Sequence, residues 1–204
     1  MSIVKLNNRG VKDATAFGSI SSLGSLTLIQ KQTASSSASV SFTSGIDSTY
    51  KEYIFFFINM HPSVDEPKFT FQVDTGTNTN YNQQITSTQF QDYHTEDGSL
   101  TGLGYGAGDD QANGTAFQTL IQNVEADNDN ATNGFLHLFN PSSTTFVKHF
   151  YGRFYTQQSS GGYVYANGQY PAGYINTTTA ITRVQFKMSS GNIDSGDILL
   201  FGLN

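Results

Sequence analysis

The sequence predicts an all-β fold, a jelly-roll-like antiparallel β-sandwich preceded by an extended N-terminal arm. Apolar segments of strand length recur along the 204 residues, separated by clusters of glycine, asparagine, serine and proline. No segment of ten residues shows the 3.6-residue apolar period of a helix. Because the connecting loops are unequal and one is very long, an eight-stranded jelly roll is favoured over other sandwiches.

The predicted arm covers residues 1–24, which show no sustained period of 2 or 3.6. Residues 1–31 hold four basic side chains against one acidic one, whereas residues 65–129 hold eleven acidic side chains against one lysine. A basic arm ahead of an acidic body is typical of an attachment segment, although few charges can also be spread this way by chance. The residues predicted to attach the arm are Lys5, Arg9, Lys12 and Phe17.

Residues 25–204 are predicted to form a single β-sandwich domain. Strand signals begin at residues 26–28 and 40–42, where apolar and polar residues alternate. The apolar run Glu52–Met60 is continuous, which predicts a central strand buried on both faces. The alternation of Phe69, Phe71 and Val73 predicts a strand of period 2.

Residues 81–115 are predicted to form a long exposed loop, with one strand near Ile85–Phe90. This segment is polar and weakly patterned, and glycine occupies every second position from 102 to 108. The second half of the chain returns to strand patterns. They lie at residues 116–124, 135–139, 144–156, 163–165, 181–188 and 197–203, for about eight to ten strands in all.

The composition narrows the classes of function. The chain has no cysteine, which excludes disulfides, thiolate metal sites and cysteine nucleophiles. No apolar run approaches the ~18 residues that span a membrane, and the N-terminus lacks the apolar stretch of a signal peptide. We therefore expect synthesis in a cytoplasm and no membrane partner. A net charge of −6 with scattered basic residues opposes binding to nucleic acid.

No catalytic constellation or cofactor site is predicted, so the chain is expected not to be an enzyme. The acidic pairs Glu96–Asp97 and Asp109–Asp110 have the residue types of a glycosidase, but solvated charge in polar loops is the simpler interpretation. Asp127 and Asp129 are a weak calcium candidate, since their segment offers oxygen ligands at alternate positions. A tight Asx-rich turn explains the same two residues.

Tyrosine is dense in the glycine-rich segment 163–174, which is predicted to be mostly loop. Tyrosine combines apolar area with a polar hydroxyl, so such a loop suits a subunit interface or a surface that contacts glycans. A second polar segment, residues 92–110, is a candidate for the same role. The residues predicted for recognition or assembly are Tyr93, His94, Tyr105, Tyr163, Tyr165, Tyr170 and Tyr174.

Three segments carry a resemblance to a known group of proteins: Lys5–Gly18, Phe42–Phe55 and Val184–Gly196, which together make about a fifth of the chain. They are similar to segments of small virion-associated surface proteins, of decoration or fibre type, from marine tailed phages of the cyanophage-like kind. The resemblance implies a place on the exterior of a virion. It also implies phage capsid or tail proteins as partners and a homo-oligomer, with a trimer favoured.

The leading hypothesis is therefore a structural protein of a tailed-phage virion, attached through its arm, and most simply a head decoration or head fibre protein. The chain has no apolar heptad stretch for a fibre shaft, which favours the head over the tail. The alternative is a tail fibre or a receptor-binding module that recognises a host surface glycan. A hydrolase that uses Glu96, Asp97, Asp109 or Asp110 is the third hypothesis.

Overall fold

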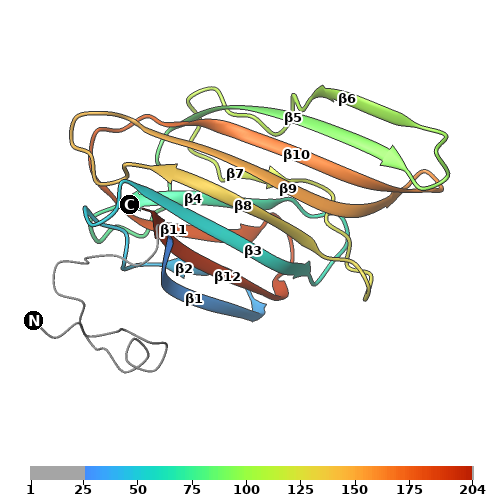
Figure 1. Cartoon of the computed structure of the whole chain (residues 1–204), viewed down its shortest axis with the longest axis horizontal. Coiled ribbons are helices and arrows are strands. Elements are labelled where there is room, and N and C mark those ends of the chain that lie inside the picture. The colour runs from blue at the N-terminus through green and yellow to red at the C-terminus, as the bar shows by residue number, and fades with distance from the viewer. Residues whose placement is uncertain (1–25, 204) are drawn as a thin grey trace, which may run out of the picture.

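The computed structural model describes residues 26–203, so the predicted arm and its residues Lys5, Arg9, Lys12 and Phe17 lie outside the described part of the chain. The regular structure of the described residues is entirely β and forms two antiparallel sheets (Figure 1). The eight-stranded sheet has the order β1 (Leu26–Ser37), β12 (Ile193–Leu203), β3 (Glu52–Pro62), β8 (Thr132–Phe139), β9 (Lys148–Ser160), β10 (Tyr163–Ile175), β5 (Ile85–Thr95) and β6 (Thr101–Tyr105). The four-stranded sheet has the order β2 (Val40–Phe42), β11 (Ile181–Met188), β4 (Phe69–Thr75) and β7 (Gln118–Ile121).

The strand order confirms the predicted jelly roll and shows four further strands in the larger sheet. Strands β1-β12-β3-β8 of the large sheet face β2-β11-β4-β7, and in each row the early strands alternate with the late ones. This is the order that two Greek keys produce when they fold over each other. No helix long and apolar enough to cross a membrane occurs within residues 26–203.

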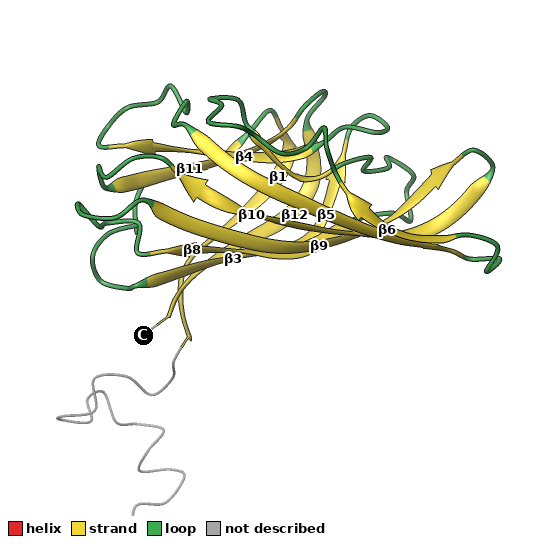
Figure 2. Cartoon of the chain, turned by 90° about the horizontal axis from the view of Figure 1, so that it is seen from above, coloured by secondary structure: helices red, strands yellow, loops and turns green. Residues whose placement is uncertain are grey.

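Four further strands, β9, β10, β5 and β6, continue the large sheet beyond this jelly roll, and we call them the sheet extension (Figure 2). They derive from two insertions: the β5–β6 hairpin lies between β4 and β7, and the β9–β10 hairpin lies between β8 and β11. β10 joins the two, because it pairs with β9 on one side and with β5 on the other. The body therefore has twelve strands rather than the eight to ten that the sequence predicts.

The core between the two sheets is built from phenylalanine, as a chain without tryptophan requires. Eight phenylalanine side chains are buried there together with aliphatic residues. Most of their ring pairs meet edge to face, the arrangement that the aromatic quadrupole favours. The eight are Phe42, Phe55, Phe57, Phe69, Phe71, Phe150, Phe154 and Phe186.

The prediction that Glu52–Met60 is buried on both faces is wrong for the outer face. Phe55 and Phe57 point into the core, but Phe56 is only half-buried and Ile58 is 43% exposed. Within residues 26–203, no layer covers this side of the sheet. Phe56 is instead flanked by the rings of Phe201 and Phe135, at centroid distances of 5.5 and 6.5 Å. The run is continuously apolar because the outer face also carries apolar side chains, Ile54, Phe56 and Ile58, although that face is only partly buried.

The prediction of a long loop over residues 81–115 is also wrong, because this segment contains β5 and β6. Strand β5 begins at Ile85 as expected but continues to Thr95, with polar residues on both faces. Two of the alternating glycines, Gly102 and Gly104, belong to β6, and Gly102 makes room for a neighbouring ring. A Cβ atom built on Gly102 would lie 2.6 Å from the Tyr93 ring.

The tyrosine-rich segment 163–174 is a strand rather than a loop, since β10 runs without interruption from Tyr163 to Ile175. Glycine and Pro171 obscure the pattern in the sequence. The proline is tolerated because the ladder between β10 and β9 has a gap at Tyr170 and Pro171, where an amide donor is not required.

Candidate functional site

Strand alternation sorts the predicted recognition residues onto the two faces of the sheet extension. Tyr93, Tyr163 and Tyr165 lie on the inner face, the side of the four-stranded sheet, and line one pocket. The other four point to the outer face of the large sheet: His94, Tyr105, Tyr170 and Tyr174. The structure thus brings three of the seven together and separates them from the rest by the thickness of one sheet.

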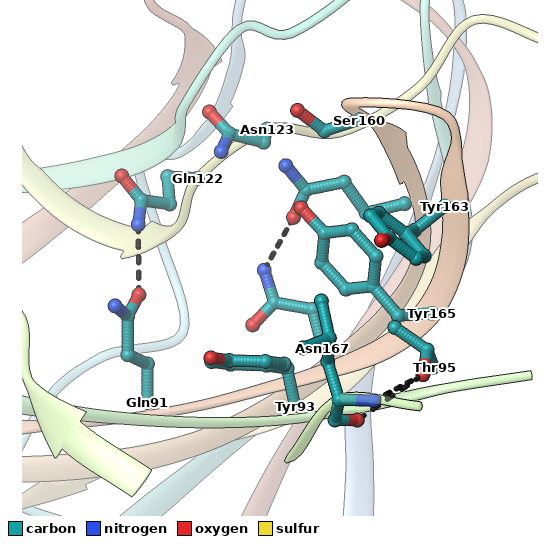
Figure 3. Close-up of a pocket in the computed structure, with 11 residues that line it drawn as sticks. Gln91, Tyr93, Thr95, Gln122, Asn123, Ser160, Tyr163, Tyr165 and Asn167 are labelled. Atoms are coloured by element: carbon teal, nitrogen blue, oxygen red, sulfur yellow. Dashed lines mark hydrogen bonds between the residues drawn. The ribbon is translucent and has the colours of Figure 1, made fainter. Parts of the chain in front are cut away.

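The inner pocket has a volume of about 300 Å³ and is formed by three segments (Figure 3). Strand β5 supplies one wall, the β9–β10 hairpin supplies the second, and the segment that follows β7 closes the third side. We call this the extension pocket. It is lined by Gln91, Tyr93, Thr95, Leu100, Gln122, Asn123, Gln158, Ser160, Tyr163, Tyr165 and Asn167.

Hydrogen bonds between amide side chains fix the walls of the extension pocket. Gln122 Nε2 donates to Gln91 Oε1 at 2.8 Å, which ties the segment after β7 to β5. Asn167 Nδ2 donates to Gln158 Oε1 at 2.8 Å, which links β10 to β9. Each amide carries both donor and acceptor atoms, so one bond leaves further capacity for a ligand.

Three tyrosine side chains form the aromatic part of the pocket. The rings of Tyr93 and Tyr165 meet edge to face, with centroids 5.9 Å apart and planes at 61°. Tyr163, at the start of β10, is 40% exposed and has room to contact a ligand. Because Tyr93 and Tyr165 stand on paired strands, the backbone itself holds their spacing.

The pocket contains no carboxylate, ammonium or guanidinium group among its lining residues. Burial raises the pKa of the Tyr165 hydroxyl, and the charges of Glu125 and Glu66 raise it further, so the tyrosine stays neutral. The lining thus offers hydrogen bonds and aromatic faces, and its titratable groups are tyrosine hydroxyls alone. The negative field of the nearby glutamates is unfavourable for anions.

The sequence did not point to the five amides of this pocket. They lie at Gln91, Gln122, Asn123, Gln158 and Asn167, in segments that read as loops or as ordinary polar strand positions. One signal was present: residues 89 and 91, and residues 167 and 169, place amides at strand period on β5 and β10. An amide on the inward face of a strand needs a hydrogen-bond partner when it is buried. Several such amides on neighbouring strands therefore indicate a polar cavity.

Glu125 lies near the pocket and supports the hairpin that forms one of its walls. Its side chain is 5% exposed, and its Oε1 accepts a hydrogen bond of 3.0 Å from the Ser159 backbone N–H. Burial raises the pKa of the Glu125 carboxyl above its ordinary 4.5, and the charges of Asp65, Glu66 and Asp127 act in the same direction. A raised folded-state pKa makes the folded protein less stable as pH rises through that pKa.

Glu125→Gln should therefore raise the free energy of unfolding at pH 7, by about 0.5–1 kcal/mol. The amide keeps an oxygen for Ser159 and removes the buried charge. The gain should shrink as pH falls toward 4.5, the ordinary carboxyl value, because the parent carboxyl is then protonated. Urea denaturation at a series of pH values measures this. Asp129→Asn, at an exposed position, is the control and should change little; equal gains from both variants would contradict this account of Glu125.

The outer face of the large sheet is aromatic and is covered by no other described residue layer. Stacked and edge-to-face rings run across it through β12, β3, β8 and β9. The His137 ring, for example, stacks on Tyr151 with centroids 4.6 Å apart. Large exposed apolar or tyrosine side chains on this face are Leu28, Ile58, Phe90, Leu103, Tyr105, Tyr151 and Tyr155.

The three carboxylates that the register places on the outer face all have partners. Asp197 pairs with Lys31 at 2.7 Å, and Glu52 bonds to His137. Asp92 accepts a hydrogen bond of 2.9 Å from the Tyr170 hydroxyl.

Arg153, which its pairing with Phe135 places on the same face, forms no ion pair with a carboxylate among the described residues. Its Nε donates to the Tyr155 hydroxyl at 3.1 Å, and the Tyr155 and Tyr170 hydroxyls link it to Asp92.

The remaining acidic candidates make local contacts. Asp109 pairs with Lys68 at 2.7 Å, and Asp110 accepts from the Tyr105 hydroxyl at 2.5 Å. Asp97 accepts from the backbone and side chain of Ser99, as a turn residue does. Glu96 lies in the same turn.

Asp127 and Asp129, the calcium candidate, are exposed, and the Asp127 backbone carbonyl accepts from the Asn130 N–H in a tight turn. Within residues 26–203, no three histidine or acidic side chains gather closely enough to hold a metal ion. None of the known protein-family models, curated proteins or solved structures matches this chain.

Proposed function

We propose that this chain is a structural protein on the exterior of a tailed-phage particle, present in many copies and attached through residues 1–24. The observation that carries the proposal is the aromatic outer face of the large sheet, which no other described residues cover and on which Asp197, Glu52 and Asp92 each have an ion-pair or hydrogen-bond partner. A face of this kind is suited to packing against other subunits, because its exposed apolar area can be buried there while its charged side chains keep the hydrogen-bond partners they already have.

Two further observations support this role. Jelly rolls are a recurrent architecture of viral capsid and lectin domains, although a fold alone does not define a function. The second is the resemblance of three segments to virion surface proteins of marine phages, which suggests that the particle is a tailed phage. Within this role, decoration of the head, with homo-oligomeric assembly, is the form that a chain without a fibre shaft suits best.

A cryo-EM map of the assembled phage particle tests the location. We expect density for the jelly roll and its sheet extension on the capsid shell. Density at the tail would instead favour the receptor-binding alternative, which the extension pocket supports. Absence of the chain from the particle would contradict the proposal in either form.

Particles that carry Leu103→Glu or Leu28→Glu should lose most of the protein, to about a tenth of the parental occupancy. Both side chains are on the outer face, at opposite ends, and are 76% and 52% exposed, so the monomer should still fold. Quantitative mass spectrometry of purified particles measures the occupancy. Phe146→Glu, 66% exposed in the loop after β8, is the matched control. If it were lost to the same extent, the outer face would not be the packing surface.

A further inference from the structure

We infer that the extension pocket is a binding site for an uncharged carbohydrate, specifically a mono- or disaccharide unit of a neutral glycan. The site lies on the inner face of the sheet extension, opposite the surface proposed for assembly, so it stays open when the outer face is covered. The inference goes beyond the proposed structural role and does not depend on where the particle carries the chain.

The chemistry of the lining matches the chemistry of a sugar. A pyranose presents hydroxyl groups that donate and accept at once, and its ring presents a less polar face of C–H groups. Side-chain amides are suited to hydroxyls for the same reason, because each amide has both a donor and an acceptor. Five amides line the pocket, and tyrosine rings can cover the C–H face while their hydroxyls bond to the rim.

The size and rigidity of the pocket support the same ligand class. Its volume of about 300 Å³ is at the lower end of small-molecule sites, which occupy roughly 300–1,000 Å³. Gln91 and Tyr93 stand on β5, and Tyr165 and Asn167 stand on the paired strand β10. Side chains anchored on paired strands need little ordering when a ligand binds, and this lowers the entropic cost of binding.

The charges around the extension pocket favour neutral sugars over anionic ones. No cationic side chain lines the pocket to pair with a carboxylate or sulfate. Glu125, whose oxygen holds the Ser159 amide, and Glu66 impose a negative field at Tyr165. Sugars such as uronic or sialic acids would lose their hydration here without gaining a counter-charge.

The pocket also lacks what hydrolysis of a glycan requires. Glycosidases place two carboxyl groups on either side of the scissile bond. The described lining holds none. Asp97 and Asp110, which the sequence offered as candidates, bond instead to Ser99 and Tyr105 outside it. The site would therefore hold a sugar and leave it intact.

The test uses the full chain and an array of immobilised neutral and anionic oligosaccharides, followed by calorimetric titration with the best neutral sugar. Tyr163→Ala and Gln122→Ala should each weaken binding by about tenfold or more. Tyr105→Ala is the matched control, since Tyr105 is 48% exposed against 40% for Tyr163 but lies on the opposite face. It should bind like the parent, and circular dichroism of all three variants should show the parental β spectrum.

Three results would overturn the inference: no glycan bound on the array, binding confined to anionic sugars, or losses from Tyr105→Ala with none from Tyr163→Ala or Gln122→Ala. The last would move the site to the outer face. Because binding is measured on the isolated chain, its failure is distinguishable from a failure to find the chain on the particle.

Discussion

Replacing Phe186 with alanine should lower the free energy of unfolding by about 3–5 kcal/mol, the largest loss we expect from a single substitution. The side chain is fully buried on β11 and meets five other phenylalanine rings. The closest are Phe57 and Phe55, at centroid distances of 5.0 and 5.1 Å. The others are Phe42, Phe69 and Phe71, at 6.2, 6.1 and 6.5 Å.

The loss should be near the upper end of this range, because the neighbours of Phe186 come from both sheets and cannot close together without moving the sandwich. Urea denaturation followed by circular dichroism measures it. Phe146→Ala removes the same atoms from a side chain that is 66% exposed and should cost little. Similar losses of stability in the two variants would contradict the claim that the buried packing of Phe186 on β11 causes the loss.

Much of the jelly roll was predictable because its signals are local. The alternation of Val184, Phe186 and Met188 marks β11, and all three side chains are buried as the period requires. Phe69 and Phe71 mark β4 in the same way. Clusters of turn residues separate these strands, so the fold class follows from short stretches of sequence alone.

The sheet extension was predictable only in part: the strand predicted at 144–156 overlaps β9 and the one near Ile85–Phe90 is the start of β5, whereas β6, most of β10 and the rest of β5 were missed. β5 is held by β10, and the two strands enclose a hydrophilic space instead of a hydrophobic core. Their inward positions are therefore amides and tyrosines such as Gln91 and Asn167, which look like loop residues. A period-2 pattern of hydrophobicity cannot report a strand whose buried face is polar.

The same reasoning explains why seven candidate residues separated into two groups. Tyr93 and His94 are adjacent in sequence, so in a strand they must point to opposite faces. In a loop, side chains do not alternate between two faces, so the loop prediction gave no reason to separate these two residues. Knowing that segments 85–95 and 163–175 are strands would have been enough to separate the pocket from the outer face.

Asp74→Ala should lower the free energy of unfolding by about 2–4 kcal/mol, the second largest loss we expect. Its carboxylate is 1% exposed and accepts three hydrogen bonds at the end of β4. The donors are the backbone N–H groups of Thr75 and Tyr81, at 2.8 and 2.9 Å, and Gln83 Nε2 at 3.2 Å. Alanine would leave the buried Tyr81 N–H without an acceptor, which is the costly half of a broken hydrogen bond.

The loss should also be felt locally, since residues 76–84 lead from β4 directly into β5 of the sheet extension. Hydrogen exchange at the Tyr81 amide should accelerate in Asp74→Ala by more than the global loss of stability accounts for. Asp97→Ala is the matched control, because Asp97 also accepts two hydrogen bonds, both from Ser99, but in an exposed turn. It should leave unfolding nearly unchanged, because water replaces the lost acceptor there. An equal loss at both positions would contradict the view that burial makes the hydrogen bonds of Asp74 costly to remove.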